Sequence, residues 1–412
     1  MKILYINNYH YPRGGADRIY LETADLLKAR GHEVIYFSVK DHNSIPLHQN
    51  EYFVRPVNFF SKRISENLIN SFKFIYSIEA KKKLELIIKK EKPDLAHLHI
   101  FYGRLTLSIL PILKKYNIKT VMTIHDYKLI CPTYRLLDNE CNLCEKCASG
   151  SYIYCILKKC NKGNLSYSVV AALETFIRDL FFPYEEYIDK FIMVSKFVLE
   201  KHVEYKPSLK NKAVNIYNFT EIWGNNNKIY GSHDYYLSFG RLSREKGLLT
   251  LLKAWRKFPR LKLKIAGEGE YRNEICQFIK ENHLTDVEML GLLNGDDLIR
   301  QIQGAKFIVV PSEWYEPFGL TIIESFAHGT PVIGAKIGGI AELIKDKYNG
   351  ILFESNNVVS LAAAIRAAES ISQENYYQMS KKAFESVNNQ FNKEIYYNNL
   401  IEVYNDLVEA SR

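Results

Sequence analysis

The feature that most constrains the fold is the regular alternation of short apolar runs with amphipathic stretches along the chain. In the first half, runs suited to buried strands are separated by stretches with helical periodicity, such as 15–30 and 104–116. The strand candidates are Ile3–Asn7, Val34–Val39, Leu95–His99, Thr120–His125 and Phe191–Val194. This alternation is typical of βαβ units, which form a parallel sheet covered by helices on both faces.

A second series of the same kind begins near Ala213. Its strand candidates are Ala213–Tyr217, Tyr235–Phe239, Leu263–Ala266, Val287–Leu290, Phe307–Val310, Pro331–Ile333 and Gly350–Phe353. A chain of 412 residues is too long for one ordinary core, so the pattern predicts two α/β domains. We place them at residues 1–212 and 213–390, with an aromatic amphipathic helix at 391–412.

Two carboxylates, Glu316 and Glu324, follow the strand candidate Phe307–Val310 and have seven residues between them. Because proline suits a first helical position, Pro317 predicts a helix over 316–328. The two carboxylates then share one broad face, about 12 Å apart along the axis. That exceeds the ~5–9.5 Å of a glycosidase acid/base pair and suits hydroxyls at two ends of an extended ligand. The alternative is an amphipathic helix with two solvated glutamates.

Two cations, Arg241 and Lys246, occupy a glycine-flanked loop directly after the strand candidate Tyr235–Phe239. Cations at this spacing on a strand-to-helix loop can clamp the two phosphates of one diphosphate. They would also neutralise negative charge that develops on a leaving group. The alternative is an ordinary basic surface loop.

Two further loops follow strands of the first half. Paired glycines, Gly14 and Gly15, let backbone N–H groups approach a phosphate or sugar. They do not form the G-x-G-x-x-G fingerprint, which makes a nicotinamide oxidoreductase an unlikely interpretation. His125 and Asp126 end another strand candidate, so we expect the histidine to face a ligand cleft. A purely structural histidine is the alternative.

The segment from Val309 to Glu342, with its two glutamates and the glycine-rich stretch after them, resembles the signature of the family-4 retaining glycosyltransferases of GT-B fold. The resemblance covers essentially the whole chain. It implies two facing Rossmann-like domains with a cleft between them and a final helix that crosses back to the first domain. It also implies transfer of a hexose or N-acetylhexosamine from a UDP- or GDP-sugar. The acceptor would be a glycan or lipid-linked molecule in surface polysaccharide or glycolipid synthesis.

The resemblance also implies roles for single residues. Glu316 would contact hydroxyls of the donor sugar, and His125 would touch a distal hydroxyl of that sugar. Arg241 and Lys246 would hold the diphosphate, and Glu324 would bind the ribose. The other donor-binding candidates are Gly14 and Gly15 across the cleft, the backbone amides of Phe318, Gly319 and Leu320, Gly291 near the base, and Asp126 beside the histidine.

The donor region shows no Asp-x-Asp motif and no Ser-His-Asp arrangement. We therefore expect the diphosphate to be stabilised without a metal, and catalysis to need no cofactor. The hypothesis for the reaction is a retaining transfer in which the leaving phosphate helps to deprotonate the acceptor. The alternatives are a non-catalytic subunit of GT-B fold that binds a partner and, third, a phosphorylase of the same fold.

Six of the seven cysteines lie between Cys131 and Cys160. In a cytoplasmic protein such a cluster favours a metal over disulfides, and Cys-x2-Cys spacing lets two thiolates share one ion. We predict a structural zinc site. The predicted ligands are Cys144, Cys147, Cys155 and Cys160, with Cys131 or Cys141 as alternatives. An iron–sulfur cluster is the second interpretation and free thiols in a loop the third.

Charge is uneven: residues 1–212 hold 33 Lys and Arg against 22 Asp and Glu, and the remainder holds 22 against 24. The basic first half favours an anionic partner, such as a membrane surface, a lipid diphosphate or a charged glycan; a solvated lysine-rich face is the alternative. The long, aromatic and basic segment Phe59 to Lys92 suits peripheral contact with an anionic membrane. We expect no nucleic-acid partner.

The sequence contains no apolar run of about eighteen residues, so no transmembrane helix is predicted. The polar start MKILYINN indicates a first buried strand rather than a signal peptide. The expected location is the cytoplasm, with peripheral contact at the inner face of the cell membrane.

Overall fold

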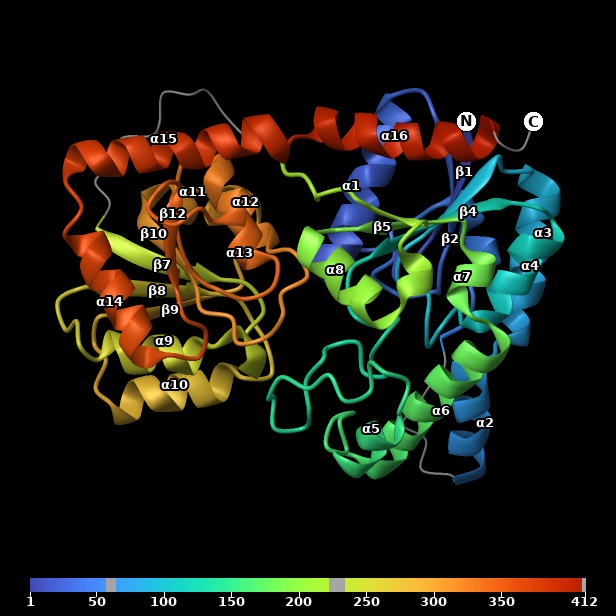
Figure 1. Cartoon of the computed structure of the whole chain (residues 1–412), viewed down its shortest axis with the longest axis horizontal. Coiled ribbons are helices and arrows are strands. Elements are labelled where there is room, and N and C mark those ends of the chain that lie inside the picture. Colours follow the sequence, from blue (N-terminus) through green and yellow to red (C-terminus); the bar gives the residue numbers. More distant parts are fainter. Residues whose placement is uncertain (57–63, 222–233, 410–412) are drawn as a thin grey trace. The chain divides into compact units, whose positions relative to one another are not determined.

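The computed structural model describes residues 1–56, 64–221 and 234–409. The chain divides into two compact units, which Figure 1 shows in sequence colours. Unit 1 comprises Met1–Ile216 and Tyr396–Arg412, and unit 2 comprises Tyr217–Ile395. The Asn- and Gly-rich stretch 223–232, whose composition predicts a loop or linker, lies outside the described residues, as does the start of the basic segment, 59–63.

Unit 1 is built on a six-stranded sheet in the order β2-β1-β3-β4-β5-β6, and every neighbouring pair is parallel. Its central strands are buried almost completely because helices cover both faces. The strands are β1 (Lys2–Ile6), β2 (Glu33–Phe37), β3 (Leu95–Leu98), β4 (Lys119–Ile124), β5 (Lys190–Met193) and β6 (Ala213–Asn215).

The helices of unit 1 lie between these strands in the chain. They are α1 (Gly15–Ala29), α2 (Ile64–Ile75), α3 (Ile78–Glu91), α4 (Leu110–Lys115), α5 (Ile153–Leu157), α6 (Leu165–Phe181), α7 (Tyr184–Tyr187) and α8 (Lys196–Tyr205). Short 3-10 turns occupy His48–Tyr52, Leu107–Ile109 and Pro207–Leu209. Side-chain oxygens of Ser77, Asn164 and Ser195 accept backbone N–H bonds and so begin α3, α6 and α8.

The strand at Ala213 belongs to the first sheet, contrary to our assignment of it to the second series. β6 pairs in parallel with β5, with Val214 opposite Ile192. Unit 1 therefore continues to Ile216, four residues beyond the predicted boundary at 212. A short apolar run reveals that a strand forms, but it does not reveal which sheet edge that strand extends.

Unit 2 repeats the parallel architecture in the order β12-β11-β10-β7-β8-β9. Its strands are β7 (Tyr235–Phe239), β8 (Lys262–Ala266), β9 (Val287–Gly291), β10 (Ala305–Val310), β11 (Val332–Ala335) and β12 (Gly350–Phe353). Its helices are α9 (Leu248–Trp255), α10 (Arg272–Glu281), α11 (Gly295–Gly304), α12 (Leu320–Ala327), α13 (Ile340–Leu343), α14 (Val358–Glu369) and α15 (Gln373–Gln390). A 3-10 turn, Arg244–Lys246, precedes α9.

The last helix, α16 (Lys393–Glu409), begins in unit 2, and from Tyr396 onward it belongs to unit 1. The Thr23 hydroxyl donates to the Tyr396 hydroxyl at 3.1 Å, and the Tyr404 hydroxyl lies 2.5 Å from Nδ1 of His97. These buried bonds join α16 to α1 and β3. Within the described ranges, no helix is both long enough and apolar enough to cross a bilayer.

Candidate functional site

Glu316 lies in a loop and not in a helix, which corrects the predicted helix over 316–328. The loop follows β10, and α12 begins only at Leu320. Gly319, the N-cap, has φ 119°, a conformation that favours glycine and interrupts helical geometry. A residue before proline also avoids the helical region, which affects Glu316 before Pro317. The 12 Å axial separation from Glu324 therefore does not apply, although Glu324 itself lies on α12.

Glu316 and Lys246 form an ion pair through Nζ and Oε1. The Ser312 hydroxyl donates to the same carboxylate oxygen at 2.8 Å, and Glu316 is only 8% exposed. Burial opposes ionisation of this carboxyl, but the Lys246 ammonium and its hydrogen bond outweigh that effect. The pKa of Glu316 therefore lies below its ordinary value. A charged, preorganised pair stands where the sequence predicted a sugar-binding glutamate and a phosphate-binding lysine.

The guanidinium of Arg241 is bound by a carboxylate through one nitrogen, while most of the side chain is exposed. Its Nη2 lies 3.0 Å from Oε1 of Glu245, which also accepts from the Ser243 hydroxyl at 2.8 Å. Glu245 is buried, whereas the Arg241 side chain is 60% exposed. The buried carboxylate thus fixes the direction of a guanidinium whose remaining N–H groups can reach an anion.

Backbone contacts lock the Lys246 loop against the Glu316 loop. Gly247 has φ 69°, and a Cβ at this position would lie 1.9 Å from the carbonyl oxygen of Pro311. Close by, the Glu313 amide donates to the Glu245 carbonyl at 2.8 Å. Only glycine fits this crossing, so Gly247 lets the ends of β7 and β10 bring Lys246 to Glu316.

Two glycines that carried no predicted role, Gly338 and Gly339, support Glu316 from the other side. A Cβ on Gly338, which has φ 55°, would lie 2.6 Å from the Glu316 backbone nitrogen. The Gly339 amide donates to the Glu316 carbonyl at 2.7 Å. The paired glycines after β11 were the available signal, but nothing in the sequence tied them to a residue 22 positions earlier.

The other donor-side candidates of unit 2 lie at element ends. Phe318 is buried and packs against the rings of Tyr217 and Phe391, with both centroid distances 6.0 Å. This fixes the start of α12, where the amides of Gly319 and Leu320 lie. Gly291 ends β9 with φ 71°, and its carbonyl accepts the Gly267 amide at 2.7 Å.

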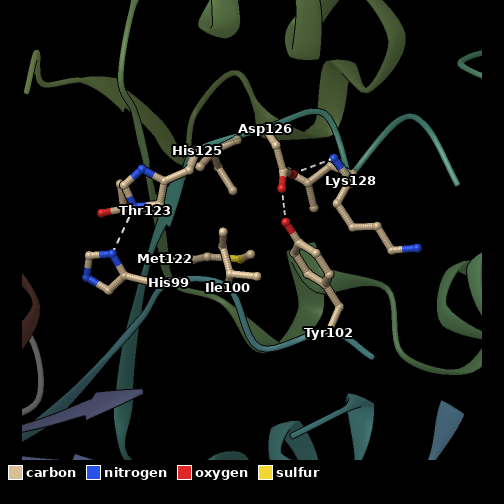
Figure 2. A pocket seen from close by; sticks show the side chains of 10 residues that line it. His99, Ile100, Tyr102, Met122, Thr123, His125, Asp126 and Lys128 are labelled. Atoms are coloured by element: carbon tan, nitrogen blue, oxygen red, sulfur yellow. Dashed lines mark hydrogen bonds between the residues drawn. The ribbon is translucent and has the colours of Figure 1, made fainter. Parts of the chain in front are cut away.

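In unit 1, His125 lies at the end of β4 beside a second histidine that the sequence analysis missed. Nδ1 of His99 and Nε2 of His125 are 2.9 Å apart, and the rings stack at 5.1 Å (Figure 2). They border a small pocket lined by His99, Ile100, Tyr102, Met122, Thr123, Ile124, His125, Asp126, Lys128 and Leu129. The neighbouring strands β3 and β4 bring the two rings together across 26 residues of sequence.

These histidines are neutral. Burial lowers the pKa of His125 to about 4, and burial with the nearby His97 and His125 holds the pKa of His99 well below its ordinary value. Two neutral imidazoles can share a hydrogen bond in which one nitrogen donates and the other accepts. His125 then keeps one ring nitrogen for a ligand hydroxyl, and it would meet that ligand without a charge.

Asp126 faces the same pocket and is bound by its neighbours. The Tyr102 hydroxyl donates to its Oδ2, and the Lys128 amide donates to its Oδ1 at 2.9 Å (Figure 2). Burial raises the pKa of Asp126 to about 6, against the opposing effect of the Tyr102 bond. Asp126 therefore caps the following turn, while the partner of His125 is His99.

A polar side chain directly after β1 holds the first turn of α1, which follows the Gly14–Gly15 loop. Asn7 Nδ2 donates to Asp17 Oδ1 at 2.9 Å, at the start of α1. Gly14 is extended, and a Cβ there would meet nothing nearer than an Asp17 oxygen at 3.9 Å. Unlike Gly247, Gly14 is not required by the fold, so space beside its backbone is available to a ligand.

The cysteine segment, residues 131–160, is folded against α6. Cys147, Cys155 and Cys160 are buried in one cluster with Ala172. Burial, followed by the neighbouring thiols of Cys131 and Cys160, raises the pKa of Cys147 to about 12. Among the residues that the structure describes, no three His, Cys, Asp or Glu side chains are arranged to hold a metal ion. The thiols are gathered, but they do not form a ready four-ligand site.

Comparison with known proteins places this site in a family. Residues 13–222 match the model described as "Glycosyltransferase Family 4", and residues 219–386 match the one described as "Glycosyl transferases group 1". The chain belongs to glycosyltransferase family 4. The second match contains Arg241, Lys246 and Glu316, and the first contains His125.

Two relatives agree with this assignment, and a solved structure shares the fold. An uncharacterized glycosyltransferase of Methanocaldococcus jannaschii is 34% identical over 172 residues, which are 41% of this chain and 46% of that protein. O-antigen chain mannosyltransferase C of Escherichia coli is 24% identical over the full length of both. A crystal structure of Anabaena HepE in complex with UDP-glucose has a TM-score of 0.69, at 18% identity, covering 99% of this chain and 100% of that one. The predicted α/β, GT-B fold class is confirmed.

Proposed function

We propose that this family-4 chain transfers a hexose or N-acetylhexosamine from a UDP- or GDP-sugar to a glycan or lipid-linked acceptor, with retention of anomeric configuration. The observation that carries the proposal is the Lys246–Glu316 pair at the carboxyl ends of β7 and β10, the edge where parallel sheets bind ligands. Support for the donor comes from HepE, whose structure contains UDP-glucose. Support for surface polysaccharide synthesis comes from the O-antigen mannosyltransferase.

The residues of unit 2 divide the work by charge. Lys246 and Arg241 would bind the diphosphate and stabilise its charge as the sugar departs, with no metal required. Ionised Glu316 would accept hydrogen bonds from sugar hydroxyls, and Glu324 on α12 would do so from the ribose. The amides that open α12 would add dipolar stabilisation of the anion.

The transfer itself balances without a further reactant. The bond between the anomeric carbon and the diphosphate oxygen breaks, and the bond from the acceptor oxygen to that carbon forms on the same face. The acceptor proton passes to the leaving phosphate. In unit 1, neutral His125 would hold a sugar hydroxyl by its free ring nitrogen, and the open backbone at Gly14 and Gly15 would lie near the ligand.

The test begins with a thermal-shift screen of UDP- and GDP-sugars, followed by donor hydrolysis and NMR of the product. We expect one donor to raise Tm and to be hydrolysed slowly without added metal. Hydrolysis by wild type that is lost in Glu316→Gln, with unchanged Tm, supports the assignment. A chain that binds no donor is a non-catalytic subunit, and an inverted anomeric centre refutes retention.

We also propose that the cysteine segment takes a structural zinc, with Cys144, Cys147, Cys155 and Cys160 as ligands and Cys131 or Cys141 as substitutes; an iron–sulfur cluster is the alternative. The support is the cluster of buried thiols against α6. Closing the cluster around an ion needs rearrangement of the cysteine side chains, because no three metal-binding side chains of the described residues are arranged to hold one. Metal analysis of anaerobically purified chain decides between zinc, iron and none, and a metal-free folded sample removes the proposal.

A further inference from the structure

Helix α6 has the reverse of the usual arrangement of a surface helix. Its buried face is largely polar and includes Ser168, Glu174, Thr175 and Arg178, all at most 1% exposed. Its exposed residues are apolar except for Ser166: Leu165, Val169, Leu173, Phe176, Leu180 and Phe181, each between 40% and 62% exposed. A helix of a globular protein normally turns its apolar stripe to the core, so this one is built to meet a second apolar phase.

The spacing makes these side chains one continuous stripe. Leu165, Val169, Leu173, Phe176 and Leu180 follow one another at intervals of three or four residues along 17 residues of helix. We call them, with Phe181, the apolar α6 face. Helix α5 precedes it with exposed Ile153 and Leu157, and α2 beside it exposes Phe72 (Figure 1). Exposed apolar side chains therefore also occur on the two helices that contact α6.

The inner face of α6 explains why the helix cannot rotate to bury these residues. Arg178 donates to the carbonyls of Lys128 and Leu129 at 2.6 and 3.1 Å, and Glu174 binds the buried Lys128 ammonium at 2.5 Å. Turning the helix over would break these bonds and leave the charges of Arg178, Glu174 and Lys128 without their partners, which is costly. The same bonds connect α6 to the turn that follows Asp126.

Charge decides which apolar phase fits. No carboxylate is among the exposed residues of α6, and exposed Lys159 and Lys162 lie in the turn between α5 and α6. Exposed Lys73 follows Phe72 on α2. An apolar stripe with exposed lysines in the turn before it and on the contacting helix α2 is complementary to a bilayer with anionic headgroups. In a dimer formed through this face, lysines would face lysines, and α6 would provide no exposed carboxylate to pair with them.

We propose that the apolar α6 face is a membrane-docking surface that inserts into the headgroup region of an anionic bilayer. The segment Phe59 to Lys92, for which membrane contact is predicted, contains α2, the helix that flanks this face. The proposal does not depend on the donor or on catalysis. The inner face of α6 binds Lys128 and Leu129, which line the unit 1 pocket. Docking of α6 would therefore hold this pocket close to the bilayer surface.

The test is flotation of the full chain with phosphatidylcholine vesicles, with and without phosphatidylglycerol. We expect wild type to float with anionic vesicles, and Leu173→Ser/Phe176→Ser to lower partitioning by at least about tenfold. Lys159→Glu/Lys162→Glu should lower it by about fivefold per lysine, and only with anionic vesicles. The matched control is Ile45→Ser/Val359→Ser, whose side chains are 42% and 66% exposed and lie outside α6 and outside the segment Phe59 to Lys92; it should float like wild type.

Circular dichroism and Tm establish that each variant is folded, which the exposure of the changed side chains favours. Wild type that stays at the bottom with anionic vesicles overturns the proposal. So does flotation that the Leu173→Ser/Phe176→Ser change leaves intact. A dimer in sedimentation that the same change dissociates overturns it as well, because the face would then join two copies of the chain.

Discussion

The candidate site residues of the two units are held in place in different ways, by charge pairing in unit 2 and by burial in unit 1. In unit 2, Glu316 and Lys246 are an ion pair held by glycine crossings at which no side chain fits. In unit 1, His99 and His125 are neutral rings held by burial, and the Gly14 loop of the same unit contains an extended, exposed glycine. The first arrangement suits an anionic diphosphate and the second suits uncharged hydroxyls. The difference teaches that a glycine can be required by the fold, as at Gly247, or can leave space for a ligand, as at Gly14.

The largest expected effect is on the charged pair. Glu316→Gln keeps the shape but leaves Lys246 facing a neutral amide, so sugar contacts weaken and Lys246 loses its ionic partner. We expect kcat/KM for donor hydrolysis to fall by about 10²–10³-fold. The control is Glu354→Gln, an exposed carboxylate of unit 2 at 67%. Equal activity of the two variants would remove Glu316 from the catalytic set.

Next in size is the contrast between two glycines. Gly247→Ala places a Cβ 1.9 Å from the Pro311 oxygen in a left-handed conformation, and we expect it to cost about 2–4 kcal/mol in free energy of unfolding. Gly14→Ala has open space and should change that free energy by less than about 0.5 kcal/mol. Urea unfolding measures both. If Gly14→Ala is the more destabilising change, the distinction between fold-required and ligand-facing glycines is wrong.

A third expectation concerns acid. Burial lowers the pKa of His97 to about 3 and of His125 to about 4, so their contribution to stability is present above pH 6.5 and is lost as pH falls toward 4. Asp17 and Asp126, both raised to about 6, act in the opposite direction. The histidine shifts are the larger ones, and His10 and His99 add to them, so unit 1 should weaken on acidification.

His125→Asn should therefore flatten the fall in unfolding free energy between pH 6.5 and 4.5 by about 1–2 kcal/mol. Urea unfolding followed by far-ultraviolet circular dichroism at several pH values measures it. His42→Asn, at a side chain 88% exposed, should leave the profile unchanged. A profile that His125→Asn leaves unchanged would mean that this histidine is not held neutral by the fold.

The smallest expected effect is at Tyr102. Tyr102→Phe removes a hydrogen bond to a buried carboxyl, so the pKa of Asp126 should rise further and stability should fall by about 1 kcal/mol. The comparison variant is Tyr348→Phe, at an exposed ring. Thermal unfolding of both provides the measurement. No difference between them would mean that the Asp126 turn is held by its backbone bonds alone.

Sequence reasoning predicted the strands well because buried parallel strands are continuous apolar runs, as in Phe307–Val310. It singled out Lys246 and Glu316 from charges beside such runs, and the structure brings these two together, while their roles and that of Arg241 stay predictions. It failed where a left-handed glycine overrode helical periodicity, at Gly319, and where pairing joins distant segments, at His99 and Gly338. It also missed the exposed apolar face of α6, because an apolar stripe on a helix normally predicts a buried face. Only the buried position of Arg178 on the opposite face reveals that the stripe is exposed.

Helix α16 has a consequence for synthesis. The residues that complete unit 1, from Tyr396 onward, are translated after the whole of unit 2. Until then His97 lacks the Tyr404 hydroxyl and α1 lacks Tyr396. Unit 1 begins to be translated first but is completed last. A chain that stops before α16 lacks the packing and the hydrogen bonds that α16 makes with β3 and α1.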